Sequence, residues 1–443
     1  SLYTAGFYNS FTIQGRKDGN IGLKVYWPCT DIGNREGAIS LNVGQQEAGR
    51  NSSAKAASVW EVLRVSTKLG LTSFGGPVAH LGYFHDEYVR RRKWLDERSY
   101  ADLVALCQFL PGPASSQVGI GIGIARAGLW GGFAAWAGFT LPSVVALALF
   151  AFVLQGYDLA NAGWIHGLKI VAAAIVAHAI VGMGQKLTPD RDRVTIAAAA
   201  ATITLLWPEA YVQVFLILVS GMLGLRLYRG SKETAGHHIR ISIRKGVAVG
   251  CLALFFVLLV TLPLLRQAAD IEWIALFDSF YRSGSLVFGG GHVVLPLLER
   301  EVVPTGWVSQ EHFLAGYSAA QAVPGPLFTF AGYLGAMSGG MTGVAAATIA
   351  IFLPSFLLVV GVLPFWSELR SNPNVQGALV GINAAVVGIL LAALYDPLWT
   401  TAILSAADFA LALLLFIMLV YWRLPPWIVV VVGAIGGVLL EYL

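Results

Sequence analysis

The sequence contains few charged residues for its length. Its 443 residues include 29 Lys or Arg and 25 Asp or Glu, so that 12% are charged while 56% are hydrophobic. Soluble domains carry about twice that charged fraction. Because a soluble protein of this size must cover its core with a polar exterior, this class is excluded, and disorder is excluded on the same figures. The composition predicts an all-α polytopic membrane protein that lies in a lipid bilayer.

Cysteine is also scarce, and several functional motifs are absent. Cys29, Cys107 and Cys251 are too far apart in sequence for a disulfide framework or a CxxC metal site. The chain lacks a GxxxxGK[ST] phosphate loop, so nothing indicates ATP as an energy source. The net charge of +4 is too small to indicate nucleic acid. We therefore expect no metal, no cofactor and no nucleic-acid partner.

Residues 1–52 differ from the rest of the chain. They are polar and lack the basic and apolar regions of a secretory signal. We expect this segment to be poorly ordered or to be derived from the expression vector. Apolar segments begin near residue 56 and continue to the C-terminal end.

Three motifs occur twice, in the same order, which indicates an internal repeat. The second copies follow the first by 212 to 214 residues: Phe74-Gly75-Gly76-Pro77 with Phe288-Gly289-Gly290-Gly291, Pro111-Gly112-Pro113 with Pro324-Gly325-Pro326, and Leu141-Pro142-Ser143 with Leu353-Pro354-Ser355. We predict two homologous repeats, 53–228 and 269–443. Between them, 229–268 supplies a basic linker and one unpaired transmembrane helix.

One unpaired crossing between two equal sets of crossings would reverse the second set, giving an inverted-topology repeat. The distribution of basic residues agrees with this. The loops at 90–98, 186–193 and 226–245 are basic, whereas their counterparts near 303–306 and 396–400 contain no Lys or Arg. By the positive-inside rule we place the three basic loops in the cytoplasm of a multi-pass protein of the cell membrane.

The segment 100–126 conflicts with this rule if it crosses the membrane once, because the run Arg90–Lys93 would then face the opposite side. A re-entrant hairpin broken at Pro111-Gly112-Pro113 removes the conflict, since both its ends stay on one side. Proline cannot continue a helix, and glycine permits a sharp turn. The alternative is that the motif only kinks two helices for packing.

The residues around the two breaks are the best candidates for a binding site. After Pro113, Ser115, Ser116 and Gln117 stand at a helix start, where free N–H groups, hydroxyls and an amide would suit a tetrahedral oxyanion. The second repeat offers one hydroxyl, Thr329. The predicted substrate-binding set comprises Gly75, Gly76, Gln108, Pro111, Gly112, Pro113, Ser115, Ser116, Gln117, Gly289, Gly290, Gln321, Pro324, Gly325, Pro326 and Thr329.

Four ionisable residues are candidates for coupling or gating. Glu87 and Glu301 correspond at an offset of 214, His85 stands beside the first, and Asp408 lies within the apolar segment 401–421. Ionisable groups at membrane depth are functional candidates. The alternative for the two glutamates is that they are solvated charges at the membrane surface.

The first repeat resembles the chromate transporter family, and the two repeats together resemble its long members, in which two domains are fused. The resemblance rests on the motifs above together with His85-Asp86-Glu87-Tyr88-Val89, Trp94 and Gly131-Gly132, and it covers about residues 56–443. It implies chromate efflux driven by the membrane potential or a proton gradient, with sulfate as a related or competing oxyanion. It also implies two domains of opposite orientation.

We therefore expect a secondary transporter of chromate and sulfate that works by alternating access between the repeats, and not an enzyme. One alternative is a proton-coupled transporter of another small solute that uses Glu87, Glu301 and Asp408. A membrane-bound oxyanion reductase is disfavoured, because the cysteines are scattered and no haem or flavin motif is present. Whether the protein forms a homodimer is left open.

Overall fold

The computed structural model describes residues 59–155, 162–207, 209–228, 243–268, 271–288, 290–370 and 372–442. Within these ranges every regular element is a helix, and they belong to one compact unit that begins at Val59. The predicted N-terminal segment 1–52, residues 229–242 of the linker and Gly289 lie outside the described residues. The proposed domain boundaries therefore remain predictions.

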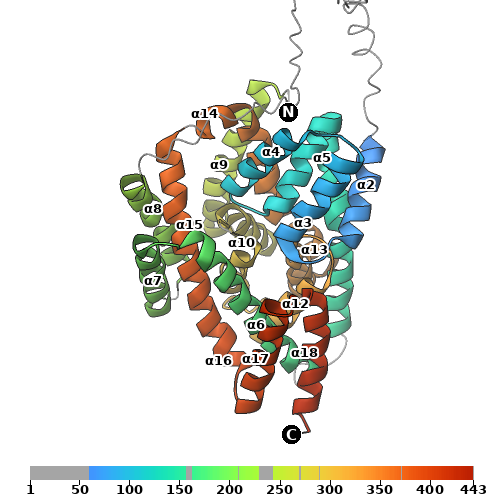
Figure 1. The fold of residues 1–443 in the computed structure, drawn as a ribbon, viewed down its shortest axis with the longest axis vertical. Coiled ribbons are helices and arrows are strands. Elements are labelled where there is room, and N and C mark those ends of the chain that lie inside the picture. The colour runs from blue at the N-terminus through green and yellow to red at the C-terminus, as the bar shows by residue number, and fades with distance from the viewer. Residues whose placement is uncertain are drawn as a thin grey trace, which may run out of the picture. The chain divides into compact units, whose positions relative to one another are not determined.

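The helices repeat in the order that the sequence motifs predict (Figure 1). The first repeat contains α2 (Val59–Thr72), α3 (Gly76–Phe84), η1 (His85–Arg91), α4 (Glu97–Phe109), α5 (Ala114–Gln155), α6 (Gly163–Leu187), α7 (Arg191–Leu206) and α8 (Ala210–Leu227). The unpaired helix is α9 (Lys245–Ala268). The second repeat contains α10 (Glu272–Leu286), η2 (Gly291–Val293), α11 (Val294–Val302), α12 (Gln310–Ala322), η3 (Leu327–Thr329), α13 (Phe330–Val362), η4 (Leu363–Phe365), α14 (Trp366–Arg370), α15 (Pro373–Ala393), η5 (Leu394–Trp399), α16 (Thr400–Ala402), α17 (Ala406–Val420) and α18 (Pro426–Leu440).

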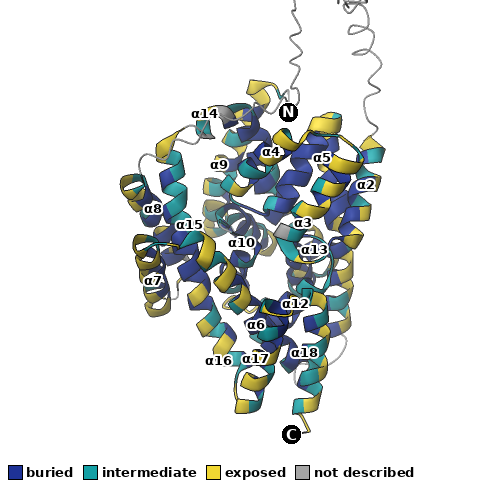
Figure 2. Ribbon diagram, viewed as in Figure 1, coloured by how far each residue is buried: buried dark blue, intermediate teal, exposed yellow. Residues whose placement is uncertain are grey.

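Among the described residues, five helical stretches are long and apolar enough to cross a membrane: 114–155, 163–187, 245–268, 327–365 and 373–402. Many large apolar side chains of α7, α8 and α9 are exposed. Figure 2 marks exposed residues along α7 and α8. Lipid accepts such a surface because these side chains are apolar, and helices suit it because they pair their backbone polar groups internally. The prediction of an all-α multi-pass membrane protein is confirmed.

The breaks at both Pro-Gly-Pro motifs are present. In the first repeat α4 ends at Phe109 and α5 begins at Ala114; non-helical backbone at Ala127 and Gly128 then divides α5 into a short arm and a long helix. The 13 residues of α4 extend about 20 Å, less than the ~30 Å hydrocarbon core. The second repeat has the same design, with a break in α13 at Gly339 and Gly340. These lengths suit arms that enter the membrane part way.

The two repeats are interlocked. The last two helices of each repeat pack on the other one: α7 and α8 lie against α15, and α17 and α18 lie against α6, as Figure 1 also shows. At the centre, α5 of the first repeat packs against α13 of the second. Neither repeat can therefore complete its helix packing without the other.

Glycine allows the interlocked helices to touch through their backbones. A Cβ atom at Gly167 in α6 would overlap the carbonyl oxygen of Gly433 in α18, and one at Gly224 in α8 would overlap that of Gly377 in α15. Membrane helices use small residues in this way, since close backbone approach replaces the hydrophobic effect that lipid removes. This explains part of the high glycine content of 50 residues.

These contacts predict unequal effects for two glycine substitutions. Gly167→Ala should destabilise the protein by about 1–3 kcal/mol, because the added methyl group overpacks the α6–α18 crossing. Gly250→Ala in α9, where no atom lies within 4 Å of the added Cβ, should be neutral or raise helix stability by up to about 1 kcal/mol. Thermal unfolding of the two purified variants in detergent measures the difference, and equal midpoints would contradict this account of the crossing.

Candidate functional site

The Pro-Gly-Pro turn of the first repeat is held by the second repeat. Gly112 has a φ of +115°, a conformation that favours glycine, and its N–H donates to the carbonyl of Val287 at 2.7 Å. Val287 directly follows α10. Because the two prolines lack an N–H, Gly112 carries the one donor of the three-residue motif.

The turn of the second repeat makes the corresponding contact with the first repeat. Gly325, with a φ of +103°, donates its N–H to the carbonyl of Ser73 at 2.9 Å, just after α2. Ser73 and Val287 are 214 residues apart, the same offset that relates the repeats. The two halves thus exchange equivalent hydrogen bonds, and each turn is positioned by the opposite half.

The serines of the Leu-Pro-Ser motifs also reach across to these turns. The buried Ser143 hydroxyl donates to the carbonyl of Pro324. The buried Ser355 hydroxyl lies against Gly112, where a Cβ atom would overlap it. The sequence identified both motifs only as markers of the repeat, so these two serines are site residues that the prediction missed. Their recurrence beside a helix-breaking proline was the available signal.

Ser115, Ser116 and Gln117 lie together behind the first turn, each at most 2% exposed. Gln117 Nε2 donates to the carbonyl of Pro111 at 2.6 Å and so braces the turn. Ser115 Oγ lies 3.3 Å from Nδ1 of the buried His80, which joins this group. The hydroxyl of Ser116 has no hydrogen-bond partner within the described part of the chain. This hydroxyl therefore has unused hydrogen-bonding capacity.

The second turn is not equivalent. Thr329 donates its hydroxyl to the carbonyl of Pro326 at 2.7 Å, within the short helix η3. Gln108 is exposed, whereas Gln321 is half-buried and its Nε2 lacks a partner among the described residues. The two glutamines therefore occupy different environments.

Three described glycines of the two Phe-Gly-Gly motifs adopt backbone conformations that favour glycine. Gly75 and Gly76 have φ values of +99° and +81°, and Gly290 has +149°. Glycine is therefore required for backbone geometry at these positions. Substrate contact at the glycine turns and at both Pro-Gly-Pro motifs stays a prediction.

Glu87 is enclosed by cations. Its carboxylate is 8% exposed and lies 2.8 Å from Arg92 Nε, 3.1 Å from Arg91 Nη1 and 3.4 Å from Lys68 Nζ. Burial alone would raise the pKa of Glu87, but the hydrogen bonds and charges of Arg92, Lys68 and Arg91 hold the pKa below its ordinary value. The carboxylate is therefore ionised at neutral pH and has a structural role in this conformation. Nearby, His85 Nε2 contacts Glu97 at 2.6 Å.

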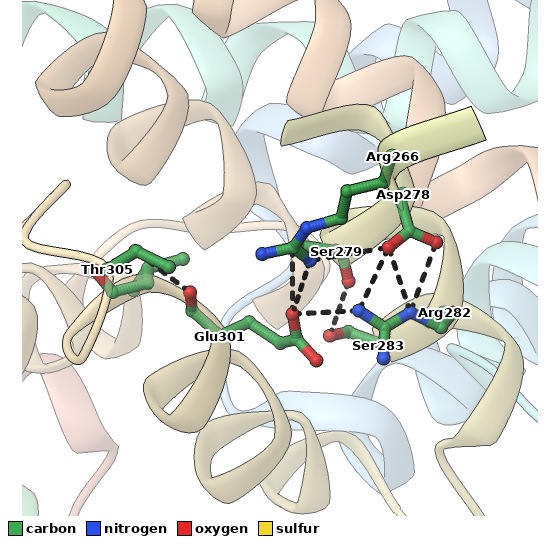
Figure 3. A network of polar contacts seen from close by, with 8 residues as sticks. Arg266, Asp278, Ser279, Arg282, Ser283, Glu301 and Thr305 are labelled. Atoms are coloured by element: carbon green, nitrogen blue, oxygen red, sulfur yellow. Dashed lines mark hydrogen bonds and ion pairs between the residues drawn. The ribbon is translucent and has the colours of Figure 1, made fainter. Parts of the chain in front are cut away.

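Glu301 belongs to a second charged cluster (Figure 3). Arg282 Nη2 lies 2.9 Å from both Glu301 and Asp278, and Arg266 Nη1 lies 3.3 Å from each. The Ser279 hydroxyl donates to Glu301 at 2.7 Å. Lys68 and Glu87 correspond to Arg282 and Glu301 at an offset of 214, so one ion pair occurs in both repeats.

Asp408 lies in the first turn of the apolar helix α17, not well inside an apolar helix as expected. The helix α17 begins at Ala406 rather than near 401, because Ser405 and Asp408 form a capping box at its N-terminus. Asp408 accepts from the N–H groups of Leu404 and Ser405 and lies 2.8 Å from His166 Nε2. Its observed function is helix capping, and a coupling role stays a prediction.

No three His, Cys, Asp or Glu side chains within the described ranges gather in a way that could hold a metal ion.

Fold and site together define a multi-pass helical membrane protein with two interlocked repeats, each broken at a buried turn. The model of the family described as "Chromate transporter" matches the chain twice, over residues 60–225 and 274–438. The chain belongs to this family, and the two matched regions are the two repeats.

Three relatives illustrate the match. A "Probable chromate transport protein" of Synechococcus elongatus is 29% identical over 401 residues, covering 87% of this chain and 96% of its own. A "Chromate transport protein" of Pseudomonas aeruginosa is 28% identical, covering 76% of this chain and 80% of its own. An uncharacterized transporter of Bacillus subtilis is 28% identical over 180 residues, 38% of this chain and 98% of its own. No solved structure matches the chain.

Lys68 and Arg282 hold corresponding positions in the two charged clusters. We expect their loss to lower the stability of the protein by unequal amounts. Arg282→Met should cost about 3–5 kcal/mol, because Asp278 is 0% exposed and would retain only the more distant Arg266. Lys68→Met should cost below about 1 kcal/mol, because Lys68 is half-exposed and Glu87 keeps Arg91 and Arg92. Thermal unfolding in detergent compares the two, and an equal loss in both variants would contradict the assignment.

Proposed function

We propose that the protein is a secondary transporter of tetrahedral oxyanions that moves chromate, with sulfate as a related or competing substrate. Membership of the chromate transporter family and the names of its relatives support the chromate assignment. Chromate and sulfate share charge and shape, so a site of hydroxyl and N–H donors discriminates poorly between them. The protein acts from the cell membrane, with the basic loops of the first repeat in the cytoplasm.

The observation that carries the proposal is the exchange of hydrogen bonds between the two turns and the opposite repeats. Because Gly112 is held by Val287 and Gly325 by Ser73, any rocking of one repeat against the other must change the surroundings of both turns. Such rocking is the usual basis of alternating access in repeat-built transporters. In this structure Ser115, Ser116 and Gln117 are occluded, which suits an intermediate closed to both sides.

The substrate would bind at the start of α5. There the first N–H groups of the helix, the hydroxyls of Ser115 and Ser116 and the second N–H of the Gln117 amide face a dianion. The helix dipole favours negative charge at this end without a buried cation. Gln108 and Gln321 would line the path on the two sides.

The serine hydroxyls can be tested directly. The double variant Ser115→Ala with Ser116→Ala should lower chromate and sulfate flux at least about tenfold, since a hydrogen bond to a charged group contributes about 1.5–3 kcal/mol. Flux of labelled anions into proteoliposomes measures the effect under imposed pH and voltage gradients. Ser338→Ala is the matched control, because that hydroxyl only bonds its own helix at Leu334.

Unchanged flux in a correctly folded serine double variant would refute the site. If chromate and sulfate flux then failed in Glu87→Gln or Glu301→Gln and depended on the pH gradient, proton coupling through these carboxylates would replace the serine site as the mechanism. If neither anion were transported by the unaltered protein, proton-coupled transport of a different solute would replace this proposal. The ionised, cation-bound state of Glu87 argues against that alternative.

A further inference from the structure

A basic cavity opens in the first repeat, and neither Pro-Gly-Pro motif lines it. It has a volume of about 690 Å³ and is lined by Glu61, Arg64, Val65, Lys68, Arg91 and Arg92. Four cationic side chains thus face one carboxylate, with Glu87 behind them. Its predicted place is the cytoplasmic face, because the basic loop 90–98 supplies part of the wall.

The carboxylates present do not balance these cations. Arg92 divides its contacts between Glu87 and Glu61, and Lys68 and Arg91 both contact the same Glu87 oxygen. Arg64 is exposed and has neither a hydrogen bond nor an ion pair within the described part of the chain. Arg126 also contacts Glu61, at 3.5 Å. Five cations therefore share two carboxylates and leave an excess of three positive charges, of which a dianion would neutralise two.

Two of the cations cannot be explained by membrane topology alone. Arg64 and Lys68 lie on the helix α2, not in the loop, and are four residues apart on one face. Like charges at this spacing destabilise a helix by a few tenths of a kcal/mol. Two like charges that destabilise the helix in this way are expected where the two side chains together bind an anion.

The second repeat shows that the fold does not need this positive charge. At the offset of 214, Arg64 corresponds to Asp278, a reversal of charge, while Lys68 and Glu87 correspond to Arg282 and Glu301. There two arginines meet two carboxylates (Figure 3), and the side chain of Asp278 is completely buried. One repeat thus carries an open cationic cavity where the other carries a closed, neutral brace.

We propose that this cavity binds a doubly charged tetrahedral oxyanion and is where the substrate first docks before it reaches the buried turns. The identity of the anion rests on the proposed function; the cavity itself does not. The cavity also lies close to the transport machinery. Lys68 lies one turn before the end of α2 at Thr72, and Ser73, which holds the second turn, follows directly. A cationic cleft raises the local concentration of anions and their rate of capture.

The experiment compares Arg64→Gln with Arg98→Gln in proteoliposomes of phosphatidylcholine. Both variants remove one exposed arginine from the same face, but Arg98 lies outside the cavity wall. For labelled sulfate supplied on the side of the basic loops, Arg64→Gln should raise KM about three- to tenfold with little change in kcat. The effect should shrink as ionic strength rises. Arg98→Gln should leave KM within about twofold of the unaltered protein.

A direct binding measurement separates this proposal from the proposed function. Sulfate binding to the purified Ser115→Ala, Ser116→Ala protein should persist and be weakened by adding Arg64→Gln, even if transport is lost. If Arg64→Gln alters neither binding nor KM while the serine variant abolishes flux, only the cavity proposal fails. If flux survives in the serine variant while Arg64→Gln still weakens binding, only the buried site fails.

A lipid phosphate offers the same chemistry as the free oxyanion. The measurements are therefore repeated in vesicles that contain phosphatidylglycerol. An Arg64 effect that appears only with the anionic lipid, and that free sulfate does not compete away, would show a headgroup site and overturn the proposal.

Discussion

The structure depends on satisfying one backbone donor at each of two turns inside the membrane. A Pro-Gly-Pro turn has a single N–H, on the glycine, and lipid offers no water to bond it. Gly112 and Gly325 each find a carbonyl on the opposite repeat, at Val287 and Ser73. The turns therefore cannot be formed by one repeat alone, and the helix crossings at Gly167 and Gly224 reinforce this dependence. The two repeats must therefore fold together for both N–H groups to be hydrogen-bonded.

The main outline of this arrangement was predictable from the sequence. Motifs repeated at offsets near 213 predicted both repeats and both helix breaks, because proline and glycine act locally on the backbone. The exchange of contacts was not predictable, since Ser143 and Pro324 are joined by folding and by no local pattern. The start of α17 at Ala406, capped by Ser405, was not predicted although its capping box is local, because the apolar run begins earlier, near residue 401.

The charged clusters show where the repeats have diverged. The pair Lys68–Glu87 and its counterpart Arg282–Glu301 occupy the same place, so the geometry of the pair belongs to the repeat. What surrounds each pair differs. Arg91 and Arg92 come from the loop of the first repeat, while Arg266 comes from the unpaired helix α9, which has no counterpart. The linker helix therefore completes the second cluster, and it does more than reverse the orientation of the chain.

This difference in charge between the repeats affects the side of the membrane from which an anion is captured. Two inverted repeats with identical charges would present the same surface to both sides of the membrane, and neither side would be preferred by an anion. Reversal of Arg64 to Asp278 breaks this equivalence, because it neutralises and closes the second cluster and leaves the first open and cationic. A cationic cleft favours encounter with a dianion on its own side only, since the field decays within about 10 Å in salt. Such asymmetry affects rates of capture and leaves the equilibrium to the driving gradient. The driving gradient therefore sets the direction of net movement, and the unequal access sets how readily the anion is captured on each side.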